Sequence, residues 1–382
     1  MLIINKISST QYVALFIASV LIPSFLTWGL GEGGIFFGHY WLSILFGYLT
    51  AMSNKKFMYV LFSYFLLSIF FFHSATFGER TFYSVSFLFT SACLYGLNDL
   101  KIDLEEFNSR QILTVFIIFV LCYLVSIDSH SGGESERTYY HGFIIAHHYA
   151  YIAAFFGYFF IRQEKTLLGI AIVLSGTLVG TRSGLLVSAM PLIYAAKKYF
   201  TEMEGAKIQK IIWISVLCLV GLAAVGYLFQ EQIAPTINTF QTLSVETIAE
   251  NDEEEMGKVS ASRTIFWALM FTQIAEDGFT LPNLIGRGPA ASLDFLEKNF
   301  DARIWMHNDF FDIFFCFGLL GLCVYIFCIC CYYRQTRDIY FLFMLLLAAF
   351  TNGFCTYMAV QFIALHLLSL KARVKIQMKN LQ

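Results

Sequence analysis

Charged residues are scarce in this chain, and their scarcity excludes most soluble folds. Lysine, arginine, aspartate and glutamate make up 14% of the 382 residues, whereas soluble domains carry about 25%. Hydrophobic residues make up 58%, and the mean hydropathy is +0.65. The runs 112–127 and 211–229 carry no charge over most of the roughly 20 residues that a helix needs to cross a bilayer. The composition therefore predicts an integral membrane protein rather than a soluble protein with a large core.

Several functional signatures are also absent. The chain has no P-loop and no GxGxxG motif, so a soluble nucleoside triphosphate is not the expected reactant. The net charge is −2 and no basic stripe alternates with aromatic residues, which argues against nucleic-acid binding. The nine cysteines all lie in apolar runs and show no disulfide or zinc spacing. We therefore expect no bound metal and no cofactor.

Twelve apolar runs are long enough, or nearly so, to be membrane helices. They predict an all-α polytopic protein of about 12 transmembrane helices that forms one membrane domain over residues 1–382. The first run reads as a retained span rather than a cleavable signal. The seventh and eighth runs are short and meet at Gly180 to Gly184, a pattern typical of segments that line a site. The runs cover residues 10–29, 35–52, 57–74, 81–98, 111–128, 143–161, 166–180, 183–197, 210–229, 308–331, 338–353 and 355–370.

The distribution of lysine and arginine predicts the orientation. With the N-terminus in the cytoplasm, 17 of the 25 basic residues lie inside and eight lie outside. Five of those eight belong to the long polar segment 230–306, which the rule discounts, so the short loops divide 17 to 3. Both termini are expected in the cytoplasm and segment 230–306 outside.

Segment 230–306 is expected to be a folded, helical external loop. It holds twelve of the 27 acidic residues. Thr264–Ile274 has the apolar pattern of a helix that Ser260 or Ser262 caps and that Gly278 ends. A turn at Leu284–Pro289 and a second helix at Ala290–Phe300 follow. The acidic run Asp252–Glu255 reads as a solvated loop rather than a metal site.

Two arginines are candidates for binding an anion. Arg182 lies between two apolar runs with glycines on either side, where a guanidinium either forms a phosphate clamp or reaches to the membrane surface from a turn. Arg263 is predicted in the first turn of a helix, where its charge opposes the helix dipole. It either joins the free N–H groups to hold an anion or is an ordinary surface residue.

His307 is the candidate base. It directly precedes an apolar helix for which Asn308 is the predicted N-cap, so its imidazole is expected at the membrane boundary. His307 either acts on a substrate hydroxyl, as general base or hydrogen-bond partner, or is an interfacial histidine without a catalytic role. Asp309 and Asp312 are close enough in sequence to orient it, and an unpaired carboxylate at Asp312 would be costly one turn into the span.

A polar cluster lies where the loop after the fifth run enters the sixth. Adjacent histidines on a helix point about 100° apart, so His147 and His148 form a poor metal site. The cluster is expected to be a polar substrate wall, with hydrogen bonding in the helix core as the alternative. Its candidate substrate contacts are Arg137, Tyr140, His147 and His148.

The order of several motifs resembles that of a known family. The chain has Thr-Arg-Ser-Gly-Leu-Leu at 181–186, Ser-Arg-x-x-x-Trp at 262–267 and Leu-Ile-Gly-Arg-Gly at 284–288. The last motif is His-Asn-Asp-Phe-Phe-Asp-Ile-Phe-Phe-Cys-Phe-Gly-Leu-Leu-Gly-Leu at 307–322. Each motif is degenerate alone, but together they resemble the O-antigen polymerase and O-antigen ligase superfamily of bacterial envelope glycosyltransferases over nearly the whole chain. The family usually has Ser-Arg followed by a small residue where this chain has Thr181-Arg182-Ser183.

The resemblance implies a GT-C-like fold and metal-independent, inverting transfer of glycan from undecaprenyl diphosphate at the periplasmic face of the bacterial inner membrane. It implies that Arg182 and Arg263 hold the diphosphate leaving group and that His307 faces the acceptor hydroxyl. Arg137, His147, His148 and Arg287 are assigned to the substrate by position only, and Asn308 and Asp312 by their place beside His307. The implied partners are lipid-linked oligosaccharide donor and acceptor, membrane lipid and, as a candidate, a chain-length regulator protein.

Within this superfamily the acceptor distinguishes two activities. A polymerase extends an undecaprenyl diphosphate-linked repeat unit, whereas a ligase transfers the glycan to lipid A-core, which is strongly anionic. Segment 230–306 has twelve acidic and five basic residues, which favours the polymerase. A non-enzymatic lipid or polysaccharide transporter is a third hypothesis, but the polar residues gather at one face rather than near the midplane.

Overall fold

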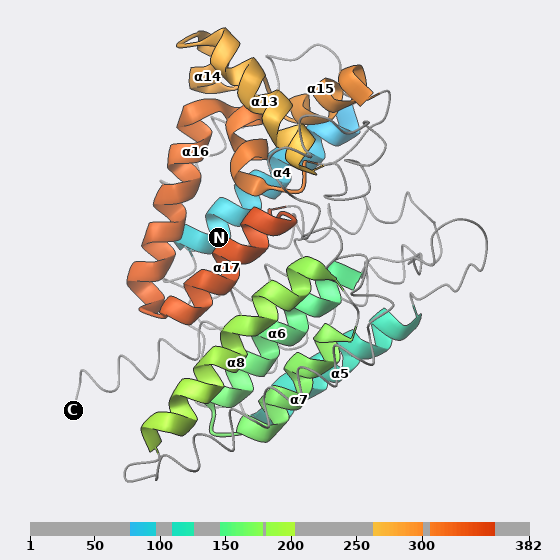
Figure 1. Ribbon diagram of the computed structural model, residues 1–382, viewed down its shortest axis with the longest axis vertical. Helices are drawn as coiled ribbons and strands as arrows, with labels where there is room; N and C mark the ends of the chain where they lie inside the picture. Colours follow the sequence, from blue (N-terminus) through green and yellow to red (C-terminus); the bar gives the residue numbers. More distant parts are fainter. Residues whose placement is uncertain are drawn as a thin grey trace, which may run out of the picture. The chain divides into compact units, whose positions relative to one another are not determined.

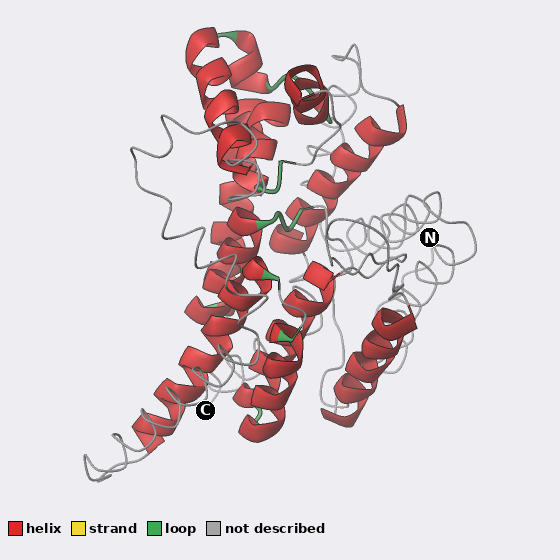
Figure 2. Ribbon diagram, turned by 45° about the vertical axis from the view of Figure 1, so that its right-hand side comes forward, coloured by secondary structure: helices red, strands yellow, loops and turns green. Residues whose placement is uncertain are grey.

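The computed structural model describes residues 77–96, 109–125, 146–178, 181–202, 263–300 and 306–355. Every regular element in these ranges is an α-helix and none is a strand (Figures 1 and 2), so the all-α prediction is confirmed for this part of the chain. The helices are α4 (Phe77–Gly96), α5 (Ser109–Val125), α6 (Ala146–Arg162), α7 (Thr166–Thr177), α8 (Arg182–Glu202), α13 (Arg263–Asp277), α14 (Leu281–Ile285), α15 (Ala291–Phe300), α16 (Asp309–Thr336) and α17 (Ile339–Thr351).

The chain divides into two compact units. One comprises Met1–Leu192 with Asp277–Gln382, and the other comprises Ile193–Glu276. The predicted loop 230–306 is therefore shared between them, because α14 and α15 belong to the first unit and pack against α16. The extent of a single membrane domain, 1–382, stays a prediction.

The predicted helices of segment 230–306 are confirmed with small shifts in their ends. Helix α13 covers the predicted Thr264–Ile274, and it ends before Gly278, whose φ of 59° stops the helix. Helix α15 covers nearly all of the predicted Ala290–Phe300. The predicted turn Leu284–Pro289 begins inside the short helix α14. Ser260, Ser262 and the acidic run Asp252–Glu255 lie outside the described residues.

Helices α6 and α7 pack closely because glycines face one another between them. A side-chain carbon on Gly157 would overlap Val173, and one on Gly169 would overlap the carbonyl of Gly157. Small residues at such a contact let two helix backbones approach closely, which is how helices associate in lipid. The opposite side of the hairpin is apolar and exposed, with Leu167 86% and Leu178 63% accessible.

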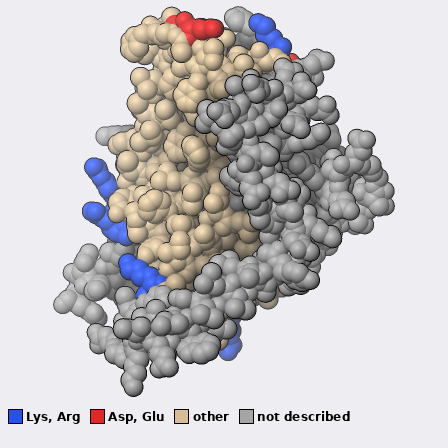
Figure 3. Space-filling model, viewed as in Figure 1, with Lys and Arg blue, Asp and Glu red and all other residues tan. Residues whose placement is uncertain are grey.

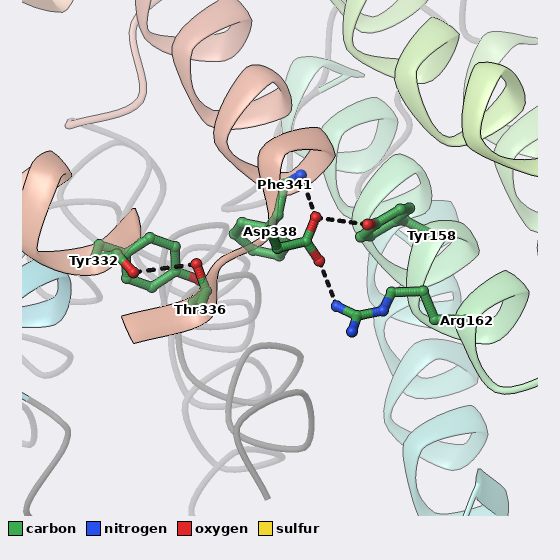
Figure 4. A network of polar contacts seen from close by, with 6 residues as sticks. All are labelled: Tyr158, Arg162, Tyr332, Thr336, Asp338 and Phe341. Carbon is green, nitrogen blue, oxygen red and sulfur yellow. Dashed lines mark hydrogen bonds and ion pairs between the residues drawn. The ribbon is translucent and has the colours of Figure 1, made fainter. Parts of the chain in front are cut away.

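At the far end of α6 a polar network joins it to α17. Asp338 caps α17 by accepting a hydrogen bond from Phe341 N at 3.1 Å. The same carboxylate accepts a bond of 2.6 Å from the Tyr158 hydroxyl and pairs with Arg162, both on α6 (Figure 4). The loop that follows α6 and the loop between α16 and α17 therefore lie at the same end of the first unit.

Helix α16 is not straight, because Gly318 has φ 68° and ψ −171°, values outside any helix. The Tyr325 hydroxyl nonetheless donates to Asp309 Oδ2 over 3.3 Å, and the Phe310 and Tyr325 rings lie 5.7 Å apart. Sixteen residues of straight helix would separate positions 309 and 325 by about 24 Å, too far for these side chains to meet. Residues 309–317, the first arm, therefore fold back on residues 319–336, the second arm (Figure 1).

The segment 284–288 closes this break. The backbone N–H groups of Arg287 and Gly288 donate to the carbonyls of Phe315 at 3.1 Å and Cys316 at 2.7 Å, which sit just before the break. A side-chain carbon on Gly286 would overlap Cys316 and Phe317, and one on Gly318 would overlap Gly286. Gly286 also has a φ of 97°. Glycine is thus required on both sides of the crossing, for close approach and for a positive φ.

The break changes the predicted span 308–331. By length and composition, one helix in the described ranges is apolar enough to cross a membrane: Asp309–Arg334, which contains an 18-residue stretch with a mean hydropathy of 2.7. The prediction of one unbroken helix over 308–331 is wrong at Gly318, since the two arms fold against each other. The predicted runs 81–98, 111–128, 143–161, 166–180, 183–197 and 338–353 correspond to α4, α5, α6, α7, α8 and α17.

The total of 12 spans remains a prediction. The runs 10–29, 35–52, 57–74 and 210–229 lie outside the described residues, as does 355–370 apart from its first residue.

Replacing Gly286 or Gly318 with alanine should destabilise the protein by more than the same change at Gly278. All three glycines have positive φ, and alanine there costs on the order of 1–3 kcal/mol of backbone strain. Only Gly286 and Gly318 add an overlap with backbone atoms, because nothing lies within 4 Å of a side-chain carbon on Gly278. Thermal unfolding of the purified variants measures the difference. An equal loss of stability in all three variants would contradict the close packing of Gly286 against Gly318.

Candidate functional site

His307 lies at a backbone position that the following residues hold in place. Its φ of 55° is left-handed, a region that few residues other than glycine adopt and that is often found at functional sites. Asn308 is buried, and its side-chain oxygen accepts from Phe310 N at 3.0 Å and Phe311 N at 3.2 Å. The predicted N-cap is therefore confirmed. The Asn308 amide also donates to the Phe350 carbonyl at 3.0 Å, which ties the start of α16 to the end of α17.

Asp309 joins three segments of the chain. Its Oδ2 accepts hydrogen bonds from Phe354 N at 2.6 Å, Cys355 N at 2.9 Å and the Tyr325 hydroxyl at 3.3 Å. The side chain is 3% exposed. Hydrogen bonds are electrostatically stronger in the protein interior than in water. Asp309 therefore holds the first arm of α16 against its second arm and against the turn that follows α17, and so sets the position of His307 two residues before it.

Asp312, one turn further along the first arm, is held by α15. The Ser292 hydroxyl donates to its Oδ1, and the Cys316 thiol lies 3.7 Å from the same oxygen. Both carboxylates lie in the first turn of α16, where the helix dipole favours negative charge. Both carboxylates are predicted orienters of His307, and Asp312 is also a predicted substrate contact. Those roles stay predictions.

A second group of predicted residues meets where α6, α7 and α8 come together. A side-chain carbon on Gly176 would overlap Ala153, and one on Gly184 would overlap Ala150, so the end of α7 and the start of α8 both touch the first turns of α6. His148, in the first turn of α6, is 5% exposed. Arg182 is the first residue of α8, and His147 is the second residue of α6. The polar start of α6 and the turn that carries Arg182 are therefore neighbours.

The start of α8 has the chemistry of an anion site. The Thr181 carbonyl accepts from Leu185 N at 3.0 Å, which makes Thr181 the residue that precedes the first helical turn. Its buried hydroxyl oxygen has no hydrogen-bond partner among the described residues. Free N–H groups at a helix start attract phosphates, and the hydroxyl and the adjacent Arg182 would add to that attraction.

Arg287, a predicted substrate contact, is engaged with protein groups. It pairs with Asp277, donates to Asn283 Oδ1 at 2.7 Å and lies 4.3 Å above the Phe315 ring. Its buried Nη1 has no hydrogen-bond partner in the described part of the chain. Through these contacts Arg287 holds the 284–288 turn against the first arm of α16. Its role in substrate binding stays a prediction.

The structure does not place the remaining predicted residues relative to these groups. Arg263 is the first residue of α13, which belongs to the second unit up to Glu276. Arg137 and Tyr140 lie outside the described residues. The first unit therefore presents two groups, one at the start of α16 and one at the start of α8.

A small cavity beside the first arm of α16 adds residues that sequence reasoning missed. It is lined by Tyr83, Ser86 and Phe87 of α4 together with Asp309, Asp312 and Cys355, among others. Three serines and a threonine, Ser84, Ser86, Thr90 and Ser91, interrupt the apolar run of α4 and are all buried. Polar residues grouped in an otherwise apolar run were the signal for this site.

Comparison of the chain with known protein families finds no family that matches it, and comparison with curated proteins finds no similar protein.

Replacing Asp309 with asparagine should destabilise the fold of α16. The amide removes the charge and puts a donor where the carboxylate now only accepts, so on the order of 2 kcal/mol of stability is lost. Glu276→Gln, at an exposed residue of α13, is the matched control with the same loss of charge. Thermal or denaturant unfolding of the purified variants measures both changes. If the Asp309→Asn protein is as stable as the Glu276→Gln protein, the Asp309 carboxylate does not stabilise the fold of α16.

Proposed function

We propose that the protein is a polytopic glycosyltransferase of the bacterial inner membrane, with a GT-C-like fold of about 12 spans, and that it is an O-antigen polymerase. It would transfer glycan from undecaprenyl diphosphate to an undecaprenyl diphosphate-linked repeat unit at the periplasmic face. The observation that carries this proposal is the start of α8. There Arg182 and the buried Thr181 hydroxyl, which has no partner in the described part of the chain, lie at a helix N-terminus next to the histidine-bearing start of α6.

The surface of the first unit supports a membrane location. Large apolar side chains are exposed along several helices, among them Leu167 of α7, Leu320 and Phe327 of α16 and Phe343 of α17. Soluble monomers rarely expose apolar surface so widely. In the view of Figure 3 most of the described surface is uncharged, and both basic and acidic side chains lie near its edges.

The network at Asp338 supports the proposed orientation. The lysine and arginine bias assigns Arg162, Arg334 and Arg337 to cytoplasmic loops. Arg162 pairs with Asp338, which directly follows Arg337. Two loops assigned to the same side of the membrane are therefore in contact, as the orientation requires.

The chemistry needs few protein groups. A sugar diphosphate already carries a good leaving group, so the main task is to stabilise its departing charge, which arginines and helix N–H groups can do. In the proposed step the acceptor oxygen attacks the anomeric carbon from the face opposite the diphosphate. The bond from that carbon to the diphosphate breaks, and its electron pair leaves with the diphosphate. The hydroxyl proton passes to His307, acting as general base.

A transporter is the second candidate, and the break in α16 is the observation that favours it. Discontinuous helices line the sites of many transporters, where freed backbone groups bind the ion or substrate. Here the carbonyls of Phe315 and Cys316 before the break accept hydrogen bonds from Arg287 and Gly288. The break is thus closed by the protein's own backbone, which favours the enzyme.

Arg182→Ala, Arg263→Ala and His307→Ala should each abolish product formation by the purified protein. The substrate for the assay is the undecaprenyl diphosphate-linked repeat unit alone, and the readout is the ladder of chain lengths. Arg334→Ala, at an exposed residue near the end of the second arm, is the control and should keep wild-type activity. Activity that persists in chelator supports metal independence.

The acceptor decides between the alternatives. A ladder from lipid-linked repeat units alone supports a polymerase, and product that forms only after lipid A-core is added identifies a ligase. Substrate movement across vesicles without any new glycosidic bond would identify a transporter. A His307→Ala protein that makes chains of normal length would contradict the proposed base.

A further inference from the structure

The cavity beside the first arm of α16 is small and mostly apolar, but two carboxylates and a serine hydroxyl line part of its wall. It lies between α4, which contributes Tyr83 and Ser86, and the first turn of α16, which contributes Asp309 and Asp312. Cys355, in the turn after α17, also lines the cavity. The space has room for about one water molecule. It is therefore too small for a sugar and suits a water-sized species.

Within the described residues, no positive side chain compensates the two carboxylates that line the cavity. The donors to Asp309 found there are two backbone N–H groups and the Tyr325 hydroxyl, all neutral, and each of these bonds goes to Oδ2. Asp312 is approached by Ser292, Cys316 and Tyr83, which are neutral as well. No lysine or arginine in the described ranges pairs with either carboxylate. Two uncompensated negative charges in a dry site are costly.

Ser86 gives an independent sign of a ligand. Its side chain is 2% exposed, it lines the cavity, and its hydroxyl has no hydrogen-bond partner among the described residues. A buried hydroxyl without a partner costs about 1–3 kcal/mol. A ligand that both donates and accepts hydrogen bonds would satisfy this hydroxyl and Oδ1 of Asp309 together.

We propose that this cavity is a proton-binding site, in which one proton and one water molecule are shared by Asp309, Asp312 and Ser86. The site rests on the proposed function, because it would receive the proton that the acceptor hydroxyl loses at His307. Asp309 is two residues from His307 in the sequence, so the base and the proton site are close along the chain. The shared proton leaves the pair with one negative charge, which the start of α16 stabilises.

The proton balance of the reaction is then complete. The acceptor hydroxyl loses its proton to the His307 ring as the new carbon–oxygen bond forms and the diphosphate departs. The ring passes this proton to the cavity, which releases its own proton to solvent, so His307 returns to the form that can accept again. Removing the cavity proton site would leave His307 protonated for longer and slow repeated turnover.

Other titratable groups line the cavity or contact its two aspartates. Tyr83 of α4 and Cys355 in the turn after α17 line it. Cys316 of the first arm contacts Asp312, and Tyr325 of the second arm contacts Asp309. All are neutral side chains in their ordinary protonated forms. The two aspartates are thus the groups whose protonation infrared spectroscopy can follow here.

The test is infrared spectroscopy of the full-length protein purified in nanodiscs at neutral pH. A protonated carboxyl group has its own carbonyl-stretch band, which shifts in D2O. We expect this band in the wild type and its loss in both Asp312→Asn and Asp309→Asn. Ser86→Ala removes only one hydroxyl and should leave the protein folded but move the band. Glu276→Gln, outside the cavity, should leave the band unchanged.

The outcomes separate this proposal from the proposed function. A wild type without the band, or a band that survives both aspartate variants, overturns the proton site. Saturable sodium binding that Asp312→Asn removes, in place of the band, would also overturn it and show that the compensating charge is a sodium ion. A protein that shows the band but forms no glycan with any acceptor would retain the proton site and refute the glycosyltransferase.

Discussion

The break in α16 at Gly318 is the constraint on which the rest of the first unit depends. Two carbonyls before the break need donors, and the backbone N–H groups of Arg287 and Gly288 supply them. An apolar environment makes an unsatisfied backbone group cost several kcal/mol, so the turn 284–288 and the break stabilise each other. Arg287 adds its stacking on Phe315 and its pairing with Asp277.

The fold-back gives the start of α16 its surroundings. Because the first arm returns along the second, Asp309 reaches Tyr325 and the turn after α17. The position of His307 is therefore set by a network of backbone and side-chain hydrogen bonds, and not only by its place before the first residue of a helix. The same fold-back brings the first arm against α4, where Phe317 stacks on Phe87 with ring centroids 4.6 Å apart. The cavity that holds both aspartates follows from this arrangement.

Sequence reasoning located the helices and several local details. Asn308 was identifiable as a cap because an asparagine precedes an apolar run, and Gly278 as a stop because it ends a helical pattern. The motif at 284–288 was visible, but its partner Gly318 lies 30 residues away inside an apolar run that reads as one helix. A glycine in a helical pattern does not reveal its own φ, so the fold-back, and with it the contact of Asp309 with Tyr325, could not be predicted. Ser86 and Ser292 were missed because their roles depend on contacts between separate helices.

The fold-back of α16 is tested most directly by a distance measured across Gly318. Spin labels at Phe310→Cys and Val324→Cys, in a background without other cysteines, are 14 residues apart. A control pair at Leu320→Cys and Arg334→Cys has the same spacing within the second arm. Fourteen residues of unbroken helix span about 21 Å. Pulsed dipolar spectroscopy should give that separation for the control pair and a much shorter one across Gly318. Equal separations for the two pairs would mean that α16 is straight, and the arrangement of Asp309, the cavity and His307 described above would be wrong.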